Sequence, residues 1–262
     1  MTDFVAAGVD RIRRDAPLVH NVTNLVAMTL SANVLIAAGA SPIMSAAPEE
    51  AGALAAMSGA LVVNIGTLTR DWIEGAHAAV EGAVGAGRPW ILDPVGVGAT
   101  PFRRETAQAL VARGPRIIRG NASEIMALAG ASAGGKGVDS TAGAEAAGKP
   151  ARRLAMATGA VVAVTGPVDL VTDGIRTLTV ANGHPLLTRT TASGCALTAL
   201  IGAWAAVLDD PLEATAGAMA AYGVAAELAA ACAAGCGSFV AALLDALGEL
   251  DGATAARLAR VA

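Results

Sequence analysis

Short apolar runs that alternate with helical segments are the feature of this chain that most constrains its fold. The runs are rich in Val, Ile and Leu, and each ends in Gly, Pro or a polar residue; they cover residues 18–22, 41–44, 60–66, 89–94, 116–121 and 160–166. Helical patterns are predicted around and between them, over 3–14, 24–38, from Pro48 onward, and over 71–86, 103–111, 123–129 and 139–158. Continuous apolar strands separated by helices are typical of parallel sheets. The sequence therefore predicts an α/β fold with a largely parallel central sheet and helices on both faces.

The second half of the chain modifies this pattern. Two extended arms surround Asp173-Gly174 within residues 169–180, which predicts a hairpin and some antiparallel pairing near the end of the sheet. Only helices are predicted after Cys195, over about 196–208, 212–232, 238–248 and 252–260. The Gly-rich segment 131–137 is the one candidate for a mobile insertion, and no linker or repeat divides the chain. One domain over residues 1–262 is expected.

Composition and charge exclude several classes of function. Of the 262 residues only 15% are charged and 3% are aromatic, and the formal net charge is −4, so the chain has neither the basic surface nor the stacking residues of nucleic-acid binders. The apolar segments 25–39 and 197–208 are shorter than the roughly 20 residues that a membrane span needs. Residues 1–15 lack the apolar core of a secretory signal, so a cytoplasmic location is expected.

The three cysteines also fit a reducing compartment. Cys195, Cys232 and Cys236 are an odd number and have no histidine at a metal-binding spacing. Cys232 and Cys236 are four residues apart on a predicted helix, where two buried core thiols are favoured over a pair.

The stretch Thr190–Thr198 offers a site for an anion. Its small side chains leave backbone N–H groups uncovered, and it opens directly into a predicted apolar helix. A helix N-terminus has unpaired N–H groups and partial positive charge, which suits phosphate. Cys195, in the first turn, lies where a thiolate would be favoured. An ordinary helix start without a ligand is an equally simple interpretation of this stretch alone.

Polar residues follow the predicted strands and could complete such a site. They are Asn64-Ile65-Gly66, Asp93-Pro94-Val95-Gly96, Arg119-Gly120-Asn121 and Thr165-Gly166. Ligands of open parallel sheets lie beyond the carboxyl ends of the strands, so these residues are expected to converge. Each also has a plain structural alternative: Asp93 could shape a turn before Pro94, Arg119 could be a surface charge, and Thr165 could bond locally. Their shared placement favours a phosphate site.

Glu124 has two interpretations. It falls in the first turn of a predicted helix, where an acid is favourable in any case. Alternatively, Asp93 and Glu124 supply the oxygen ligands that Mg²⁺ prefers, together with nucleotide phosphates and water.

Six ordered motifs resemble the hydroxyethylthiazole kinase family of the ribokinase-like superfamily. They are His20–Asn24, Ala40–Met44, Leu92–Ala99, Arg119–Ile125, Lys136–Ser140 and Ser193–Cys195, within a match from about residue 17 to 208. The resemblance implies a ribokinase-like fold and ATP-dependent phosphorylation of 4-methyl-5-(2-hydroxyethyl)thiazole in thiamine salvage. It also implies a homotrimer with sites between subunits.

The same resemblance assigns roles to individual residues. It implies that Cys195 is catalytic, that Met44, Asn24 and Ala192 contact the substrate, that Arg119, Thr165 and Gly194 bind ATP, and that Asp93 and Glu124 lie near Mg²⁺. The family's usual Gly-Thr-Gly-Cys is Ala192-Ser193-Gly194-Cys195 here. The methyl group of Ala192 could narrow the pocket, or restrict the backbone if a positive φ is required.

Three alternatives are kept. A sibling kinase would phosphorylate another small alcohol, such as a hydroxymethylpyrimidine. A nucleotide-dependent NAD(P)H-hydrate dehydratase would use the same fold on a damaged nicotinamide cofactor. A catalytically silent nucleotide-binding module is disfavoured, because mere binding gives little reason for Asp93, Glu124 and Cys195 together.

Overall fold

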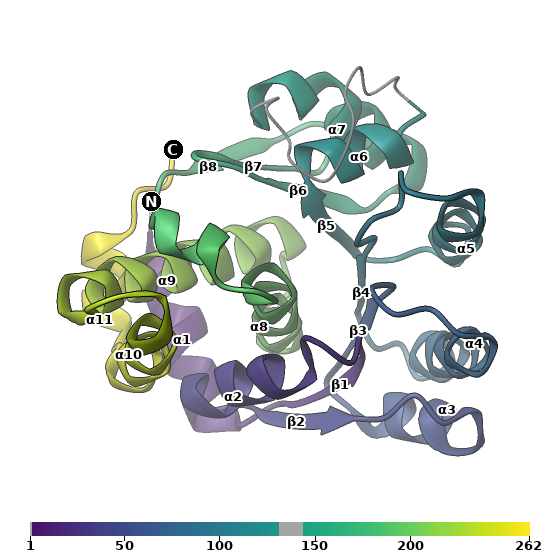
Figure 1. Cartoon of the computed structure of the whole chain (residues 1–262), viewed down its shortest axis with the longest axis horizontal. Helices are drawn as coiled ribbons and strands as arrows, with labels where there is room; N and C mark the ends of the chain where they lie inside the picture. Colours follow the sequence, from purple (N-terminus) through teal and green to yellow (C-terminus); the bar gives the residue numbers. More distant parts are fainter. Residues whose placement is uncertain (1, 131–143) are drawn as a thin grey trace.

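The computed structural model describes residues 2–130 and 144–262, and within these residues eight strands form one sheet (Figure 1). The order across the sheet is β2-β1-β3-β4-β5-β6-β7-β8. The strands are β1 (Leu18–Val22), β2 (Ser41–Met44), β3 (Ala60–Asn64), β4 (Trp90–Asp93), β5 (Ile117–Asn121), β6 (Val161–Thr165), β7 (Asp169–Thr172) and β8 (Thr177–Val180). Strands β1–β6 are parallel and β7 and β8 are antiparallel, which confirms the predicted sheet and the hairpin at its end.

Helices cover both faces of the sheet, as the alternating pattern predicts. They are α1 (Asp3–Asp15), α2 (Met28–Ala38), α3 (Pro48–Met57), α4 (Arg70–Gly85), α5 (Pro101–Val111), α6 (Ala122–Leu128), α7 (Ala144–Thr158), α8 (Ser193–Val207), α9 (Pro211–Cys232), α10 (Cys236–Glu249) and α11 (Gly252–Leu258). Along β3, Leu61 and Val63 pack with α3–α7 on one face, whereas Val62 packs with α1, α2 and α8–α11 on the other. Successive strand side chains point to opposite faces, so buried strands need apolar residues at every position.

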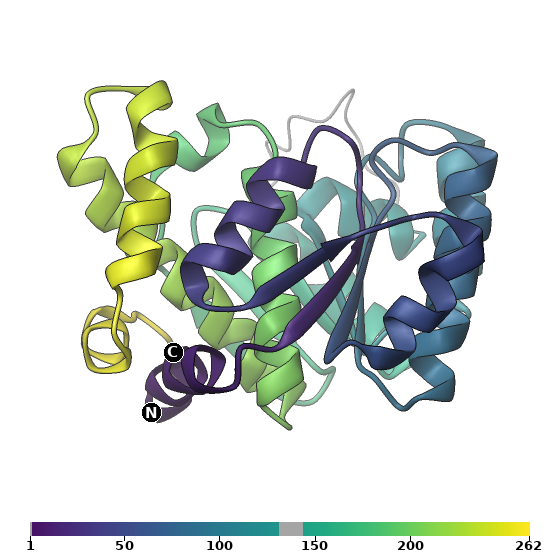
Figure 2. The same cartoon turned by 90° about the horizontal axis from the view of Figure 1, so that it is seen from below.

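Helix α8 is the central helix of its layer, in contact with the sheet, α2 and α9 (Figure 2). Its Trp204 is fully buried and occupies a space that two glycines leave open, Gly8 on α1 and Gly217 on α9. A Cβ atom on either glycine would collide with the indole ring. These glycines therefore allow α1, α8 and α9 to pack closely in a chain that has few aromatic residues.

We expect the substitution Gly217→Ala to lower the free energy of unfolding by about 1–3 kcal/mol, the usual cost of overpacking a core. The control is Gly237→Ala on α10, where a Cβ atom meets nothing within 4 Å. That variant should be more stable by about 0.5–1 kcal/mol through helix propensity. Urea denaturation measures both, and equal stability of the two variants would contradict the packing argument.

Several element boundaries differ from those predicted. Helix α8 begins at Ser193 rather than near residue 196, and α2 begins at Met28 rather than at Asn24. The Asn24 side chain instead accepts a hydrogen bond from Ala27 N–H (2.9 Å) in the turn before the helix. Three other predictions lie outside the described residues: the mobile insertion at 131–137, the helix start at Asp139 and the motif Lys136–Ser140.

The helix predicted over about 252–260 is present as α11 but ends at Leu258, and Val261 then forms an antiparallel bridge with Val180, which covers the open edge of β8. The prediction of two core cysteines was wrong. Cys232 is exposed and Cys236 is half-buried, and both are free thiols rather than core residues. Cys232 ends α9 and Cys236 begins α10, which matches the separate helices predicted over 212–232 and 238–248 and not one helix carrying both cysteines, so their four-residue spacing does not place them on one buried face.

Helix α9 (Pro211–Cys232) is, among the described helices, the one long and apolar enough to cross a membrane by length and composition. Its most apolar 18-residue window is 72% buried, against α1, α8, α10 and the sheet. The apolar composition of α9 is therefore accounted for by packing inside the fold.

Candidate active site

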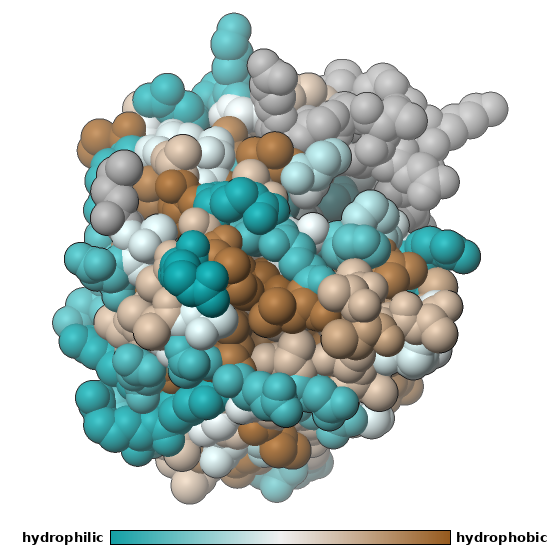
Figure 3. Space-filling view, turned by 90° about the vertical axis from the view of Figure 1, so that its left-hand side faces the viewer, coloured by the Kyte–Doolittle hydropathy of each residue, from teal (hydrophilic) through white to brown (hydrophobic). Residues whose placement is uncertain are grey.

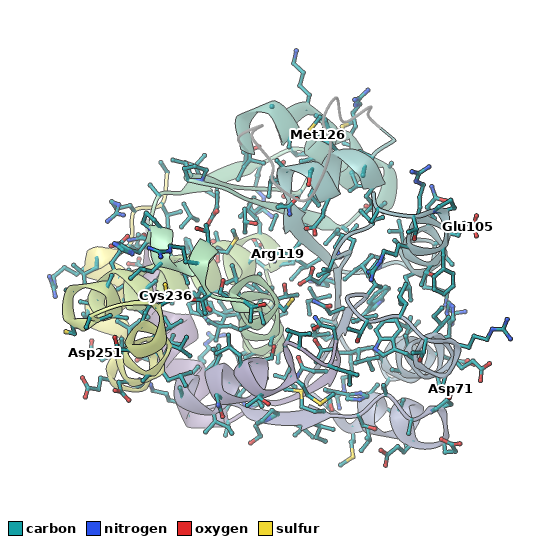
Figure 4. All side chains as sticks on the ribbon, in the orientation of Figure 1. Asp71, Glu105, Arg119, Met126, Cys236 and Asp251 are labelled. Carbon is teal, nitrogen blue, oxygen red and sulfur yellow. The ribbon has the colours of Figure 1, made fainter. Side chains whose placement is uncertain are left out.

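The residues predicted to form a phosphate site do converge. Strands β3, β4, β5 and β6 all run in the same direction, so Asn64, Asp93, Asn121 and Thr165 end at one edge of the sheet. The N-terminus of α8 lies beside this edge, and Arg119 lies between β5 and α8 (Figure 4).

Arg119 links three of the predicted site residues. Its Nη2 donates a hydrogen bond to Thr165 Oγ1 (2.9 Å), and its Nη1 lies 3.8 Å from Asp93 Oδ2. A Cβ atom on Gly194 would lie 2.8 Å from Nη1, so glycine is needed for α8 to approach the guanidinium this closely. Arg119 is only 8% exposed, which rules out the alternative of an ordinary surface charge.

Asp93 is a fully buried carboxyl group rather than a turn residue at the surface. Thr198 Oγ1 donates a hydrogen bond to its Oδ2 (2.7 Å), while Oδ1 has no partner among the described residues. Burial raises the pKa of Asp93 to about 6, which Arg119 opposes and the nearby Glu124 reinforces. A carboxylate with one free oxygen is thus held beside an arginine in a low-dielectric site.

Glu124 has the structural role of an acid in the first turn of a helix, which is one of the two interpretations of its sequence position. It forms a capping box with Asn121: Glu124 N–H donates to Asn121 Oδ1 (2.9 Å), and Glu124 Oε2 accepts from Asn121 N–H (2.9 Å). Its Oε1 accepts from Gly96 N–H (3.0 Å) in the turn after β4. Glu124 therefore ties the ends of β4 and β5 together, and the described residues contain no group of three or more His, Cys, Asp or Glu side chains that could hold a metal.

Cys195 lies in the first turn of α8, as predicted, but its expected thiolate character was wrong. Burial raises the pKa of Cys195 to about 11, and the charge of Asp93 adds to the rise, whereas Arg119 opposes it. The favourable effect of a helix N-terminus is local, whereas burial and Asp93 come from tertiary structure. Cys195 is therefore a neutral thiol near pH 7.

Ala192 precedes this helix in the left-handed region, with φ of 64° and ψ of 2°. Such a conformation costs a non-glycine residue about 1–2 kcal/mol, and strain of this kind is concentrated at functional sites. The first residue of α8, Ser193, is fixed by the buried Tyr222, whose hydroxyl donates a hydrogen bond to Ser193 O (3.2 Å). The predicted restriction of the backbone at Ala192 is confirmed.

Met44 ends β2 and Asn24 follows β1, so both lie at the carboxyl ends of the parallel strands, toward the β2 edge of the sheet. Met44 is half-buried at the end of the edge strand β2, in register with Asn21, and three strands lie between it and Arg119 on β5. Asn24 follows β1 and reaches the cysteine, because its Nδ2 donates to Cys195 Sγ at 3.4 Å.

Sequence reasoning placed Asn64 at a strand end of the site without a specific role, and it assigned no role to four other residues that shape this site: Arg103, Asp169, Thr198 and Tyr222. Arg103 Nη1 donates to Ile65 O (2.7 Å) and Val95 O (3.1 Å), and its Nη2 donates to Gly66 O (2.7 Å), which joins the turns after β3 and β4. A helical arginine carries no sequence signal for such a role. Asn64 alone had a signal, since it ends an apolar strand.

Asp169 is a buried carboxyl group beside the Thr165 turn, and its titration gives a testable prediction. Burial raises its pKa to about 6, although Gly166 N–H donates to its Oδ1 (2.8 Å) and Arg119 lies near. The folded state therefore holds this proton more tightly than the unfolded state does, and stability is lost as pH rises from about 4 through about 6. We expect Asp169→Asn to raise the free energy of unfolding at pH 7.5 by up to about 3 kcal/mol, with no gain near pH 3.5.

The matched control for this prediction is Asp173→Asn, because Asp173 shifts in the opposite direction. Despite some burial, hydrogen bonds from Ile175 N–H and from Arg176 hold the pKa of Asp173 below its ordinary value. Its replacement should lower stability at pH 7.5. Urea denaturation at the two pH values measures both variants, and a loss of stability in Asp169→Asn at pH 7.5 would refute the assignment.

The fold and the site define a class of protein. A ribokinase-like superfamily protein from Enterococcus faecalis superposes with a TM-score of 0.66 at 13% identity, covering 96% of this chain and 95% of that one, which shows the fold alone. The fold is thus ribokinase-like. Within it, an arginine, a buried carboxylate and a helix N-terminus meet at the carboxyl edge of the sheet, and these are groups that a phosphotransferase would use.

Comparison with known proteins identifies the family. The model of the hydroxyethylthiazole kinase family matches residues 9–252. A hydroxyethylthiazole kinase from Cereibacter sphaeroides is 57% identical over 93% of this chain and 92% of its own length. The structure of hydroxyethylthiazole kinase from Pyrococcus horikoshii OT3 superposes with a TM-score of 0.91 at 42% identity, covering 99% of this chain and 98% of that one. This chain belongs to the hydroxyethylthiazole kinase family.

Proposed function

We propose that this protein transfers the γ-phosphoryl group of ATP to the primary hydroxyl of 4-methyl-5-(2-hydroxyethyl)thiazole, a step of thiamine salvage. The observation that carries the proposal is the convergence of Arg119, Asp93 and Thr165 on the N-terminus of α8 beside Cys195, in a chain of this family.

In this mechanism the protein mainly positions and stabilises charge. The transition state of phosphoryl transfer is loose in most analyses, so charge on the equatorial phosphate oxygens matters more than full deprotonation of the alcohol. The Arg119 guanidinium and the backbone N–H groups of Ser193, Gly194 and Cys195 supply that stabilisation. Cys195, as a neutral thiol, orients the acceptor hydroxyl rather than removing its proton beforehand.

Binding of the two substrates is proposed at the two ends of this site. Arg119, Thr165 and Gly194 would bind ATP, and Met44, Asn24 and Ala192 would contact the thiazole alcohol. Asp93 and Glu124 would hold Mg²⁺ directly or through water. Oδ1 of Asp93 is buried and has no hydrogen-bond partner among the described residues, which suits a metal ligand. Both Glu124 oxygens already accept backbone N–H groups, which favours contact through water for Glu124. When bound, Mg²⁺ would offset the negative charge of the phosphates.

We also propose a cytoplasmic homotrimer, with one domain over residues 1–262 and sites between subunits. Figure 3 supports an interface, because an apolar area crosses the middle of the face that it shows, with hydrophilic residues around it. Large apolar side chains are exposed elsewhere as well: Leu25 (75%), Val26 (62%) and Ile36 (60%) lie in and before α2. Apolar exposure of this kind commonly marks an interaction surface.

The decisive experiment supplies the purified protein with Mg-ATP and the thiazole alcohol. Formation of ADP together with the phosphorylated alcohol, identified by mass spectrometry, is the expected result. Hydroxymethylpyrimidine and hydrated NADH are assayed in parallel. Turnover of either of these, with none of the thiazole alcohol, would replace the proposal with the sibling kinase or the dehydratase.

A further inference from the structure

Asn64, the last residue of β3, is a fully buried polar side chain next to Cys195 and Asp93 for which the proposed mechanism has no role. It lies in register with Asp93 on the adjacent strand β4. Burying an amide without hydrogen bonds is costly, so its partners and its orientation need an explanation.

Two donors fix the carbonyl end of the Asn64 side chain. Its Oδ1 accepts from Gly66 N–H (3.0 Å) and from Asn24 Nδ2 (2.8 Å). A backbone N–H can only donate, so Oδ1 and not Nδ2 must face Gly66. Asn24 is fixed in the same way, because its own Oδ1 accepts from Ala27 N–H. The direction of both amides therefore follows from the backbone.

With Oδ1 so occupied, the Nδ2 of Asn64 must turn toward the centre of the site. Nδ2 is buried and makes no hydrogen bond within the described residues. The amide nevertheless lies near enough to lower the pKa values of both Cys195 and Asp93, although burial, the larger effect, raises both. Asn24 Nδ2 reaches Cys195 Sγ from the other strand end, at 3.4 Å. One amide of fixed direction thus contacts the sulfur, and that amide is itself held by the Asn64 side chain.

We propose that Asn64 is a positioning residue that acts through Cys195: it fixes the Asn24 amide and presents its own Nδ2 to the sulfur, so that the thiol is held in one orientation toward the acceptor hydroxyl. Since the Asn24 N–H donor reaches the sulfur from the side of β1, the S–H bond is left to point away from that donor, into the site. The inference rests on the proposed function, because the orientation matters only if an alcohol binds beside Cys195.

A double-mutant cycle tests this role. In the wild-type background, Asn64→Ala should lower kcat by about tenfold or more, with KM for Mg-ATP changed by no more than about twofold. In a Cys195→Ala background the same substitution should lower kcat by less than about twofold, because the group through which it acts is gone. The control is Asn182→Ala, another buried asparagine, whose Nδ2 donates to Leu258 O (3.0 Å) rather than to a residue around Cys195. Its effect should be the same in both backgrounds.

Equal losses for Asn64→Ala with and without Cys195 would overturn the inference, since they would indicate a merely structural role. If Asn64→Ala does not fold, Asn64→Asp replaces it in the cycle, because it keeps the size of the side chain and the acceptor for Gly66 and removes the Nδ2 donor.

A second readout does not depend on the identity of the substrate. In a Cys232→Ser/Cys236→Ser background, iodoacetamide alkylation of Cys195 at one fixed pH should slow several-fold in Asn64→Asp and not in Asn182→Asp. An unchanged rate in Asn64→Asp would overturn the inference even if the kinase assay succeeds. If the protein phosphorylates a different small alcohol, the cycle is run on that alcohol, so failure of the proposed substrate and failure of the inference are told apart.

Discussion

Replacing Arg119 with methionine is expected to lower kcat by about 10²–10³-fold, the usual loss when one preorganised donor to developing charge is removed. The guanidinium is buried, donates a hydrogen bond to Thr165 and lies against Gly194, so its removal takes a fixed positive charge away from the N-terminus of α8. Its removal also leaves the buried Asp93 without the charge that lowers its pKa. Steady-state ADP release at saturating Mg-ATP and alcohol measures the change.

The control for Arg119→Met is Arg116→Met. Arg116 comes just before the same strand, but it is exposed and donates to Asp209 O (2.8 Å) away from the site. This variant should keep kcat near the wild-type value. If Arg119→Met folds and also keeps that value, the phosphate site is not where Arg119 lies.

Cys195 gives the second large effect, and the two replacements of Cys195 should differ. Cys195→Ala is expected to lower kcat by no more than about 10²–10⁴-fold, the contribution of a general base or of a well-placed hydroxyl partner. Cys195→Asp should remain active, because a carboxylate can accept a hydrogen bond from the alcohol in the same position. Both are measured by steady-state kinetics, with Cys236→Ala, on the distant α10, as a control.

Loss of activity in Cys195→Asp would be the result that contradicts the proposed role of Cys195. If Cys195→Asp keeps the circular dichroism spectrum of the wild type but turns over no substrate, Cys195 does not interact with the hydroxyl. A phosphorylated cysteine trapped with labelled ATP would instead indicate a covalent intermediate, a step that the neutral thiol with its raised pKa disfavours.

The sheet can be predicted well from the sequence because each buried strand is a continuous run of apolar residues. Residues 60–63 of β3, for example, are all apolar, and a continuous apolar run of this kind is typical of a strand buried on both faces. The Asp173-Gly174 hairpin is equally local. Boundaries were less predictable, since α2 and α8 begin where tertiary contacts permit rather than where a capping residue occurs. The exposure of Cys232 and Cys236 depends on what packs around the ends of α9 and α10, which periodicity does not reveal.

The candidate site also has features that the sequence predicts and features that it does not. That Asp93, Arg119 and Thr165 converge follows from parallel strands ending at one edge, which the sequence pattern predicts. The neutral state of the Cys195 thiol could not be predicted from the sequence, because the effects of burial and of the neighbouring Asp93 on its pKa outweigh that of the helix N-terminus. The role of Asn64 depends on the register between strands and on the direction of two amides, neither of which is encoded in a local motif.

The left-handed conformation of Ala192 limits how this enzyme could be redesigned. Libraries that alter acceptor preference commonly vary a residue beside the ligand through all amino acids, but here most substitutions would have to distort the start of α8 before their side chains could influence recognition. Only glycine, asparagine and aspartate tolerate that backbone readily. Engineering of a wider or narrower acceptor cavity should therefore begin at other positions, with Ala192→Gly as the one change expected to release strain.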